Sequence, residues 1–243
     1  MSSINLDNPN KPLMIAHRGL SGVKLENTRE AFELASNHTY FGIETDVHVT
    51  KDGKYIICHD DNLQRVAGLD MIIEQSNYDD LRKVRLFNKE GILSEELFLP
   101  NIEEYITICR DNNKVSVLEL KNLMDEKNVV EIVNIVKKLN HYENTIFISF
   151  VPENLIYCKK NFKDINCQFL MDVNTKEKEE FAFNFAKTYN LDLDLFYGPL
   201  TKEFINQCKD NNIKVNVWTV DDPNKAIELV ENGVDFITSN ILE

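Results

Sequence analysis

The chain has 243 residues, a formal net charge of −13 and a hydrophobic fraction of 43%. This length fits one large domain, and the hydrophobic fraction is sufficient for a sizeable core. The acidic balance argues against a nucleic acid partner or an anionic membrane surface, because both need basic patches. A small phosphorylated substrate needs only a few basic groups nearby, so it is compatible with a net negative charge.

The cysteines and the apolar runs of the chain indicate a cytoplasmic protein. The five cysteines are odd in number and no two have CxxC spacing, which favours reduced, buried thiols. The first twelve residues are polar and lack the apolar core of a signal peptide, and no later apolar run is long enough to cross a bilayer. We therefore expect no stable membrane association. The sequence leaves a monomer and a homodimer both open.

Eight short segments rich in apolar and β-branched residues predict strands. They are Leu13–Ala16, Ile43–Val49, Lys114–Leu120, Thr145–Phe150, Asn166–Met171, Leu193–Tyr197, Lys214–Val220 and Val234–Thr238. Helical periodicity or helix-end signals mark most of the segments between them. The predicted helices are one capped by Thr28 that runs to about Ala35, and Ile102–Asp111, Asn128–Leu139, Pro152–Asn161, Lys176–Tyr189, Thr201–Asn211 and Asp222–Asn232.

Strands that alternate with helices predict a parallel sheet, and eight of them favour closure into a (β/α)8 TIM barrel, which typically has about 250 residues. Residues 61–99 break the alternation, because they have mixed charge and scattered apolar residues without a long period. We interpret them as a small insertion after the second strand, within a single barrel domain that spans residues 1–243. A loop of this length is more often functional than idle, so we expect it to cap a pocket.

The second predicted strand carries two carboxylates on one face. Glu44 and Asp46 are two residues apart, so their Cα atoms lie about 7 Å apart and their charges repel. Glu119, near the end of the next barrel strand, adds a third carboxylate. Three oxygen donors suit a hard divalent cation, Mg²⁺ or Ca²⁺, rather than zinc. The sequence therefore predicts a metal site formed by these three residues.

Further polar residues fall at the same carboxyl ends, the face on which barrel enzymes carry their chemistry. His17 and Arg18 follow the first strand, and His59 follows a short apolar run, Tyr55–Cys58, that extends the second strand through a turn. Lys121 follows the third strand. Two imidazoles can divide acid and base roles, while an Arg and a Lys can hold a phosphate. Together with a metal, these groups predict phosphoester cleavage.

These motifs together resemble the glycerophosphodiester phosphodiesterase family, within the phospholipase C-like phosphodiesterase superfamily. The motifs that carry the resemblance are His17-Arg18-Gly19, Glu26-Asn27-Thr28, Glu44-Thr45-Asp46-Val47, Thr50-Lys51-Asp52-Gly53, His59-Asp60, Leu63–Arg65, Leu99-Pro100, Ile102-Glu103-Glu104, Glu119-Leu120-Lys121, Ser149-Phe150, Val217-Trp218-Thr219-Val220 and Gly233–Thr238. They span nearly the whole chain. One departure is Thr238-Ser239-Asn240, where the family often has an acidic residue after Thr; it concerns the closing edge of the pocket.

The resemblance implies a barrel that hydrolyses glycerophosphodiesters to glycerol 3-phosphate and an alcohol, assisted by Mg²⁺ or Ca²⁺. It implies the following roles: metal ligands Glu44, Asp46 and Glu119; an acid/base pair His17 and His59; phosphate binding by Arg18 and Lys121; Trp218 against the glycerol; and Glu26 and Phe150 at the pocket border. It does not say which imidazole is the acid, or whether water or a substrate hydroxyl is the nucleophile.

Two alternatives stay open. A lysophospholipase D-type phosphodiesterase would need an apolar mouth for an acyl chain, for which Phe150, Tyr197 and Leu200 are candidates. A non-catalytic phosphate-binding barrel would show a lost histidine or ligand, and His17, Arg18, Glu44, Asp46, His59, Glu119 and Lys121 are all in place.

Overall fold

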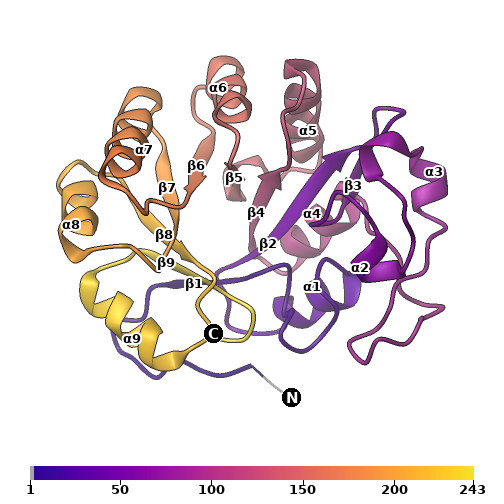
Figure 1. Ribbon diagram of the computed structural model, residues 1–243, viewed down its shortest axis with the longest axis horizontal. Helices are drawn as coiled ribbons and strands as arrows, with labels where there is room; N and C mark the ends of the chain where they lie inside the picture. The colour runs from indigo at the N-terminus through magenta and orange to yellow at the C-terminus, as the bar shows by residue number, and fades with distance from the viewer. Residues whose placement is uncertain (1–2) are drawn as a thin grey trace.

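The computed structural model describes residues 3–243, which form a closed barrel of eight parallel strands ringed by helices (Figure 1). The barrel strands are β1 (Leu13–Ala16), β2 (Gly42–Val49), β4 (Val115–Leu120), β5 (Thr145–Ser149), β6 (Asn166–Met171), β7 (Asp192–Phe196), β8 (Val215–Trp218) and β9 (Phe236–Ser239). Neighbours in the chain are neighbours in the barrel, and pairing of β1 with both β2 and β9 closes it. The predicted TIM barrel is confirmed.

Helices on the outside of the barrel connect the strands. They are α1 (Arg29–Ser36), α4 (Ile102–Asp111), α5 (Glu126–Lys138), α6 (Pro152–Asn161), α7 (Lys176–Tyr189), α8 (Lys202–Asp210) and α9 (Pro223–Asn232), with a short 3₁₀ turn, η2 (Tyr142–Asn144), before β5. Helix starts follow local sequence: the Thr28 hydroxyl accepts the N–H of Ala31, and Asn101 forms a capping box with Glu104. The predicted helices and strands match these bounds within two residues. Helix α5 starts before the predicted Asn128 because its first turn is polar.

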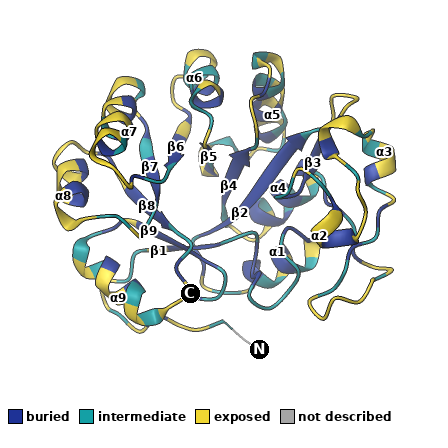
Figure 2. Ribbon diagram, in the orientation of Figure 1, coloured by how far each residue is buried: buried dark blue, intermediate teal, exposed yellow. Residues whose placement is uncertain are grey.

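Two apolar layers hold the barrel together. A small cluster fills part of its interior, and a larger one lies between the strands and the helices. The interior cluster consists of the buried residues Ile15, Val117, Ile148, Leu170 and Phe236. Figure 2 shows the strands buried and the outer helix faces exposed. Each buried aliphatic side chain of this kind contributes about 1.5–3 kcal/mol of transfer free energy. The barrel is thus a rigid support for side chains at its strand ends.

The insertion begins with β3 (Tyr55–Ile57), which pairs antiparallel with β2, and continues through α2 (Gln64–Ala67), η1 (Ile73–Gln75) and α3 (Tyr78–Leu81). It lies beside β2 and α4 in Figure 1. Its own apolar cluster includes Ile56, Leu63, Ile73, Leu81 and Leu99. Elements of three or four residues are too short to show a repeating pattern of apolar residues, which explains why the sequence has no helical period here.

Residues 3–243 contain no helix that combines the length and apolarity needed to cross a membrane. All five cysteines are buried and free, in agreement with the reduced thiols that their number and spacing predict.

Candidate active site

A cavity of about 140 Å³ opens at the carboxyl ends of the barrel strands. Its lining comes from most of the barrel strands or the turns after them. The lining residues are His17, Arg18, Glu44, His59, Glu119, Ile148, Phe150, Leu170, Asp194, Trp218 and Thr238. One side of the cavity, formed by β1, β2 and β4, is therefore charged, and the opposite side is more apolar.

The three predicted metal ligands lie together at the charged side. Asp46 of β2 is paired in register with Glu119 of β4, and Glu44 lies one inward position before Asp46. One oxygen of each carboxylate can be chosen so that all three lie within 4.8 Å of one another. All three residues are buried. Three buried carboxylates this close cannot all be ionised unless cations lie beside them.

The charge of this cluster is uneven. Burial and the charge of Asp46 raise the pKa of Glu44 well above its usual range and that of Glu119 to about 8. Burial would also raise the pKa of Asp46, but the neighbouring Arg18 and Lys121 outweigh it and lower the pKa. Lys121 Nζ lies 3.0 Å from Glu119 Oε1 and 3.6 Å from Asp46 Oδ1. Asp46 is thus the carboxylate that stays ionised most readily.

The cluster fits a hard divalent cation. Asp46 Oδ1 is buried and accepts no hydrogen bond from residues 3–243. Burial and the charge of Asp46 raise the pKa values of its two neighbours, and Arg18 and Lys121 do not outweigh these effects. Carboxylate oxygens are the preferred ligands of Mg²⁺ and Ca²⁺, and a cation there would restore the ionised form of all three acids.

Asn27 orients the cluster, although only its place in the Glu26-Asn27-Thr28 motif distinguishes it in the sequence. Its side chain donates to Asp46 Oδ2 at 2.7 Å and accepts from the hydroxyl of Thr45 at 2.7 Å. Its backbone has φ of +54°, which asparagine tolerates better than most residues. Asn27 therefore leaves Asp46 Oδ1 as the oxygen free to bind a ligand.

The turn after β1 places Arg18 against the cluster. Arg18 has φ of +55°, and its backbone N–H donates to Glu44 Oε2 at 2.9 Å. Gly19 follows with φ of +78°, and a Cβ atom there would lie 2.7 Å from the backbone of Ala31 in α1. Only glycine fits this close approach, which explains the His-Arg-Gly sequence. The Arg18 guanidinium reaches Glu26 Oε1 at 2.9 Å and has its Nε 3.6 Å from Asp46 Oδ2.

His17 is held in one tautomer by residues at the end of the barrel. Asp221 Oδ2 can only accept, so the amide nitrogen of Asn240, 2.6 Å away, donates to it. The amide oxygen of Asn240 then faces His17 Nδ1 at 2.8 Å and also accepts from the Ser21 hydroxyl. Nδ1 therefore carries the proton and Nε2, 4.0 Å from Glu44 Oε2, has the free lone pair. Burial, aided by Arg18, lowers the pKa of His17 to about 4.

His59 has a different partner. Its Nδ1 donates to Asp60 Oδ1 at 2.7 Å, and Arg65 donates to both oxygens of the same carboxylate. Burial would raise the pKa of Asp60, but the hydrogen bonds from Arg65 and His59 outweigh it and hold the pKa at about 2. The two histidines thus have different Nδ1 partners, a neutral amide oxygen for His17 and a carboxylate for His59.

The apolar side of the cavity is aromatic. The ring of Phe150 meets Trp218 edge to face at 5.6 Å, and Phe196 lies 5.5 Å from Trp218 on the other side. The indole N–H of Trp218 donates to the backbone oxygen of Asp194, which fixes the ring. Phe150 is 47% exposed and marks the mouth.

The structure brings nearly all the predicted site residues to this cavity. Lys121 and Asp46 lie directly beside the lining, bound to Glu119 and Arg18 as described. Glu26 does not line the cavity: Arg18 and Arg65 bind its carboxylate, so it touches the site through Arg18. Four lining residues were not predicted from sequence: Ile148, Leu170, Asp194 and Thr238. Ile148, Leu170 and Asp194 lie inside strands and outside the motifs, and Thr238 lies in the Gly233–Thr238 motif, which does not show that its side chain faces the cavity.

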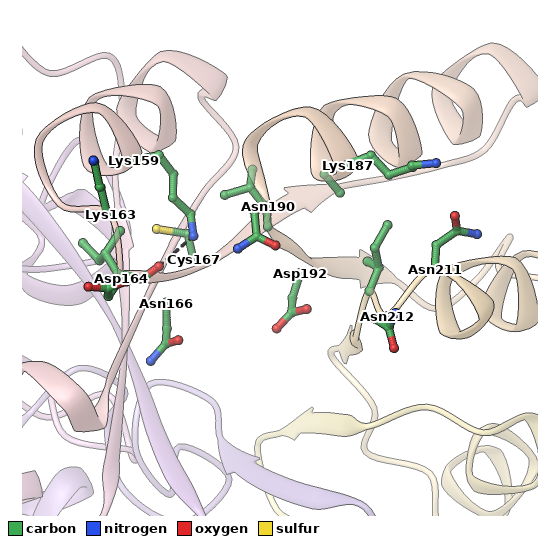
Figure 3. A pocket seen from close by; sticks show the side chains of 14 residues that line it. Lys159, Lys163, Asp164, Asn166, Cys167, Lys187, Asn190, Asp192, Asn211 and Asn212 are labelled. Atoms are coloured by element: carbon green, nitrogen blue, oxygen red, sulfur yellow. Dashed lines mark hydrogen bonds between the residues drawn. The ribbon is translucent and has the colours of Figure 1, made fainter.

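A larger hollow, about 550 Å³, lies at the opposite end of the barrel, where β6 and β7 begin (Figure 3). Half of its fourteen lining residues are lysine or asparagine, and Figure 3 shows Asp192 pointing into it. Two of its polar groups have partners in the chain: Lys159 Nζ donates to the Ile165 oxygen, and Asp192 accepts the N–H of Lys214. It contains no histidine, and we do not assign chemistry to it.

Comparison with known proteins agrees with this geometry. The model of the glycerophosphoryl diester phosphodiesterase family matches residues 17–242. A glycerophosphodiester phosphodiesterase of Caldanaerobacter subterraneus is 28% identical over 232 residues, which cover 95% of this chain and 94% of the relative. The crystal structure of a glycerophosphodiester phosphodiesterase from Parabacteroides distasonis has a TM-score of 0.77 at 27% identity, covering 95% of this chain and 94% of the other. An Oleispira antarctica phosphodiesterase, solved with the product sn-glycerol-3-phosphate, shares the fold with a TM-score of 0.84 at 23% identity, covering 98% and 96%.

Proposed function

Because this chain belongs to the glycerophosphoryl diester phosphodiesterase family and is an enzyme of that family, we propose that it hydrolyses small glycerophosphodiesters to glycerol 3-phosphate and an alcohol with the aid of a divalent cation. One observation carries the proposal: three clustered carboxylates, two histidines with different Nδ1 partners and an arginine meet at one cavity of about 140 Å³. The two related phosphodiesterases of similar length support the substrate class.

Glu44, Asp46 and Glu119 would hold the cation. It would neutralise a phosphate oxygen and stabilise the extra charge that develops on phosphorus. The chain provides further positive charge from Arg18 and Lys121, both of which lie against Asp46. We assign these two side chains to the remaining phosphate oxygens, because a forked guanidinium and an ammonium suit that anion. We propose Mg²⁺ or Ca²⁺ on the all-oxygen donor set.

The histidines divide the proton transfers. His17 Nε2, with its free lone pair, accepts the proton of the attacking hydroxyl, from water or from the substrate, as the new O–P bond forms. We assign the acid role to His59, which Asp60 holds through Nδ1: its Nε2 donates a proton to the alcohol oxygen as the old P–O bond breaks. Asn240 and Asp60 hold the two rings through their Nδ1 atoms. After product release His17 loses its proton to water and His59 takes one from water, which restores the starting state.

The size of the cavity favours a small substrate over a lysophospholipid. Pockets for drug-sized ligands have volumes of about 300–1,000 Å³, well above the 140 Å³ found here. Trp218 and Phe150, packed edge to face, supply an aromatic wall against which the three carbons of a glycerol can pack. The alcohol half would leave past Phe150 toward solvent.

The test is a panel of diesters incubated with the purified protein, with EDTA and with Mg²⁺ or Ca²⁺ added back. We expect release of glycerol 3-phosphate from glycerophosphocholine or glycerophosphoethanolamine, loss of the activity in EDTA, and its return with the cation. A faster rate on lysophosphatidylcholine would favour the lysophospholipase D alternative. Release from no diester would contradict the proposal and favour a binding role.

For the cellular location we propose the cytoplasm, supported by five free, buried thiols.

A further inference from the structure

Asp194 is a buried acid that the proposed chemistry does not use. It lies in the middle of β7, is 2% exposed and lines the cavity together with His17, Glu119 and Trp218. Its Oδ1 atom is buried and has no hydrogen-bond partner, and no ion pair to its carboxyl forms among residues 3–243. Leaving a buried polar group without a partner destabilises a folded protein, typically by about 1–3 kcal/mol. A partner outside the chain would account for the residue.

The polar neighbours of Asp194 form hydrogen bonds with one another and not with Asp194. Its register partners are Leu170 on β6, which is apolar, and Asn216 on β8. The Asn216 side chain donates to Gln168 Oε1 and accepts from the Thr238 hydroxyl, both at 3.2 Å. The other unpartnered group nearby, Gln168 Nε2, belongs to a residue that does not line the cavity. Of the two polar lining residues on the apolar side, Thr238 already donates to Asn216, so Asp194 is the one whose carboxyl group has an unpartnered oxygen.

The chemistry of the site selects a hydroxyl as the ligand. No cation among residues 3–243 pairs with Asp194, so its ionised form is unfavourable at this depth, and burial alone raises its pKa to about 8. A neutral carboxyl group donates one hydrogen bond and accepts others, which matches an alcohol. A cationic head group would need the ionised form, and it would enter a cavity that already contains Arg18.

We propose that Asp194 binds a hydroxyl of the substrate's glycerol half and thereby selects glycerophosphodiesters over diesters that lack it. This inference rests on the proposed function. The cavity is small enough that a molecule whose phosphate lies at the carboxylate cluster reaches Asp194 with its other end. Trp218, whose indole N–H is bound to the Asp194 backbone, packs along the carbons between the two. The variable alcohol is then at the open side, by Phe150.

The experiment compares two ligands that share a phosphate and differ in hydroxyls: sn-glycerol 3-phosphate and propyl phosphate. Their dissociation constants are measured by calorimetry, with Mg²⁺ present, for the wild type, Asp194→Ala and Asp194→Asn. We expect Asp194→Ala to reduce the preference for glycerol 3-phosphate by about fivefold to tenfold, the range of one hydrogen bond, and to leave propyl phosphate unchanged. Asp194→Asn, which keeps a donor and an acceptor, should retain part of the preference.

The matched control is Asp192→Asn, on the same strand but facing the hollow of Figure 3. It should leave the preference unchanged. The inference is overturned if neither Asp194 variant changes the preference, if both ligands weaken equally, or if Asp192→Asn has the same effect. If Asp194→Ala does not fold, the ligand preference of Asp194→Asn is compared with that of Asp192→Asn, and a reduced preference in Asp194→Asn alone supports the inference. A wild type that binds glycerol 3-phosphate but fails to release it from any diester would refute the proposed function instead.

Discussion

Cation binding by the three carboxylates should displace protons, so the affinity should rise with pH. The folded protein holds the pKa of Glu119 at about 8, above its ordinary value, so this carboxyl is protonated at low pH and must lose the proton to bind a metal. With that pKa, about 99% of the Glu119 groups carry a proton at pH 6 and about half at pH 8. The ratio predicts an affinity about 50-fold higher at pH 8. The raised pKa of Glu44 acts in the same direction.

Calorimetric titration with Mg²⁺ and with Ca²⁺ at pH 6 and pH 8 measures this change. Repeating it in two buffers of different ionisation enthalpy counts the protons released. The variant Glu119→Gln cannot titrate there, so we expect weaker binding at pH 8, by on the order of tenfold or more, and a shallower pH dependence. Glu103→Gln, an exposed acid on α4, is the control and should behave as the wild type. Equal affinity at the two pH values, with no proton release, would refute the reasoning.

Three further predictions follow from the contacts around the histidines. His17→Ala and His59→Ala should each lower kcat by about 100-fold or more while Mg²⁺ affinity, measured by calorimetry, stays within about twofold; a variant with wild-type kcat would remove that histidine from the chemistry. Asn240→Ala removes the acceptor that fixes His17, so kcat should fall with little change in KM, and an unchanged kcat would mean that the tautomer is set elsewhere. Arg65→Gln weakens the hydrogen bonds that depress the pKa of Asp60; a depressed carboxyl stabilises the fold above pH 4 and loses this effect as the pH falls toward 2. The melting temperature of Arg65→Gln should therefore lie below that of the wild type at pH 6 and approach it near pH 2, and a constant gap would contradict the assignment.

The barrel and the gathering of the charged residues were predictable because both follow from local pattern. Apolar runs define the strands, and parallel strands bring their carboxyl ends to one face, so Glu44, Asp46 and Glu119 had to approach one another once β2 and β4 were neighbours. The two histidines and Arg18 belong to motifs at strand ends, where the same reasoning applies.

The supporting residues were less predictable, because their roles depend on contacts across the barrel. Asn240 and Asp221 meet His17 only because β9 pairs with β1, more than 200 residues away in the chain. The group in contact with His17 is the neutral amide of Asn240. The acid, Asp221 in the loop after β8, contacts that amide. The role of Asp194 could not be predicted for another reason. The sequence of a strand does not show whether neighbouring side chains will form hydrogen bonds with an acid in it, and here Asp194 Oδ1 has none.

The central claim is that one divalent cation lies among Glu44, Asp46 and Glu119 with the phosphate between the two histidines. The most direct measurement is a crystal structure of the protein with Ca²⁺ and sn-glycerol 3-phosphate, in which the anomalous signal locates the ion. We expect one peak within about 2.3–2.6 Å of an oxygen from each of the three carboxylates, and the phosphorus between His17 and His59. A calcium ion bound away from these carboxylates, or a phosphate that neither imidazole reaches, would contradict it.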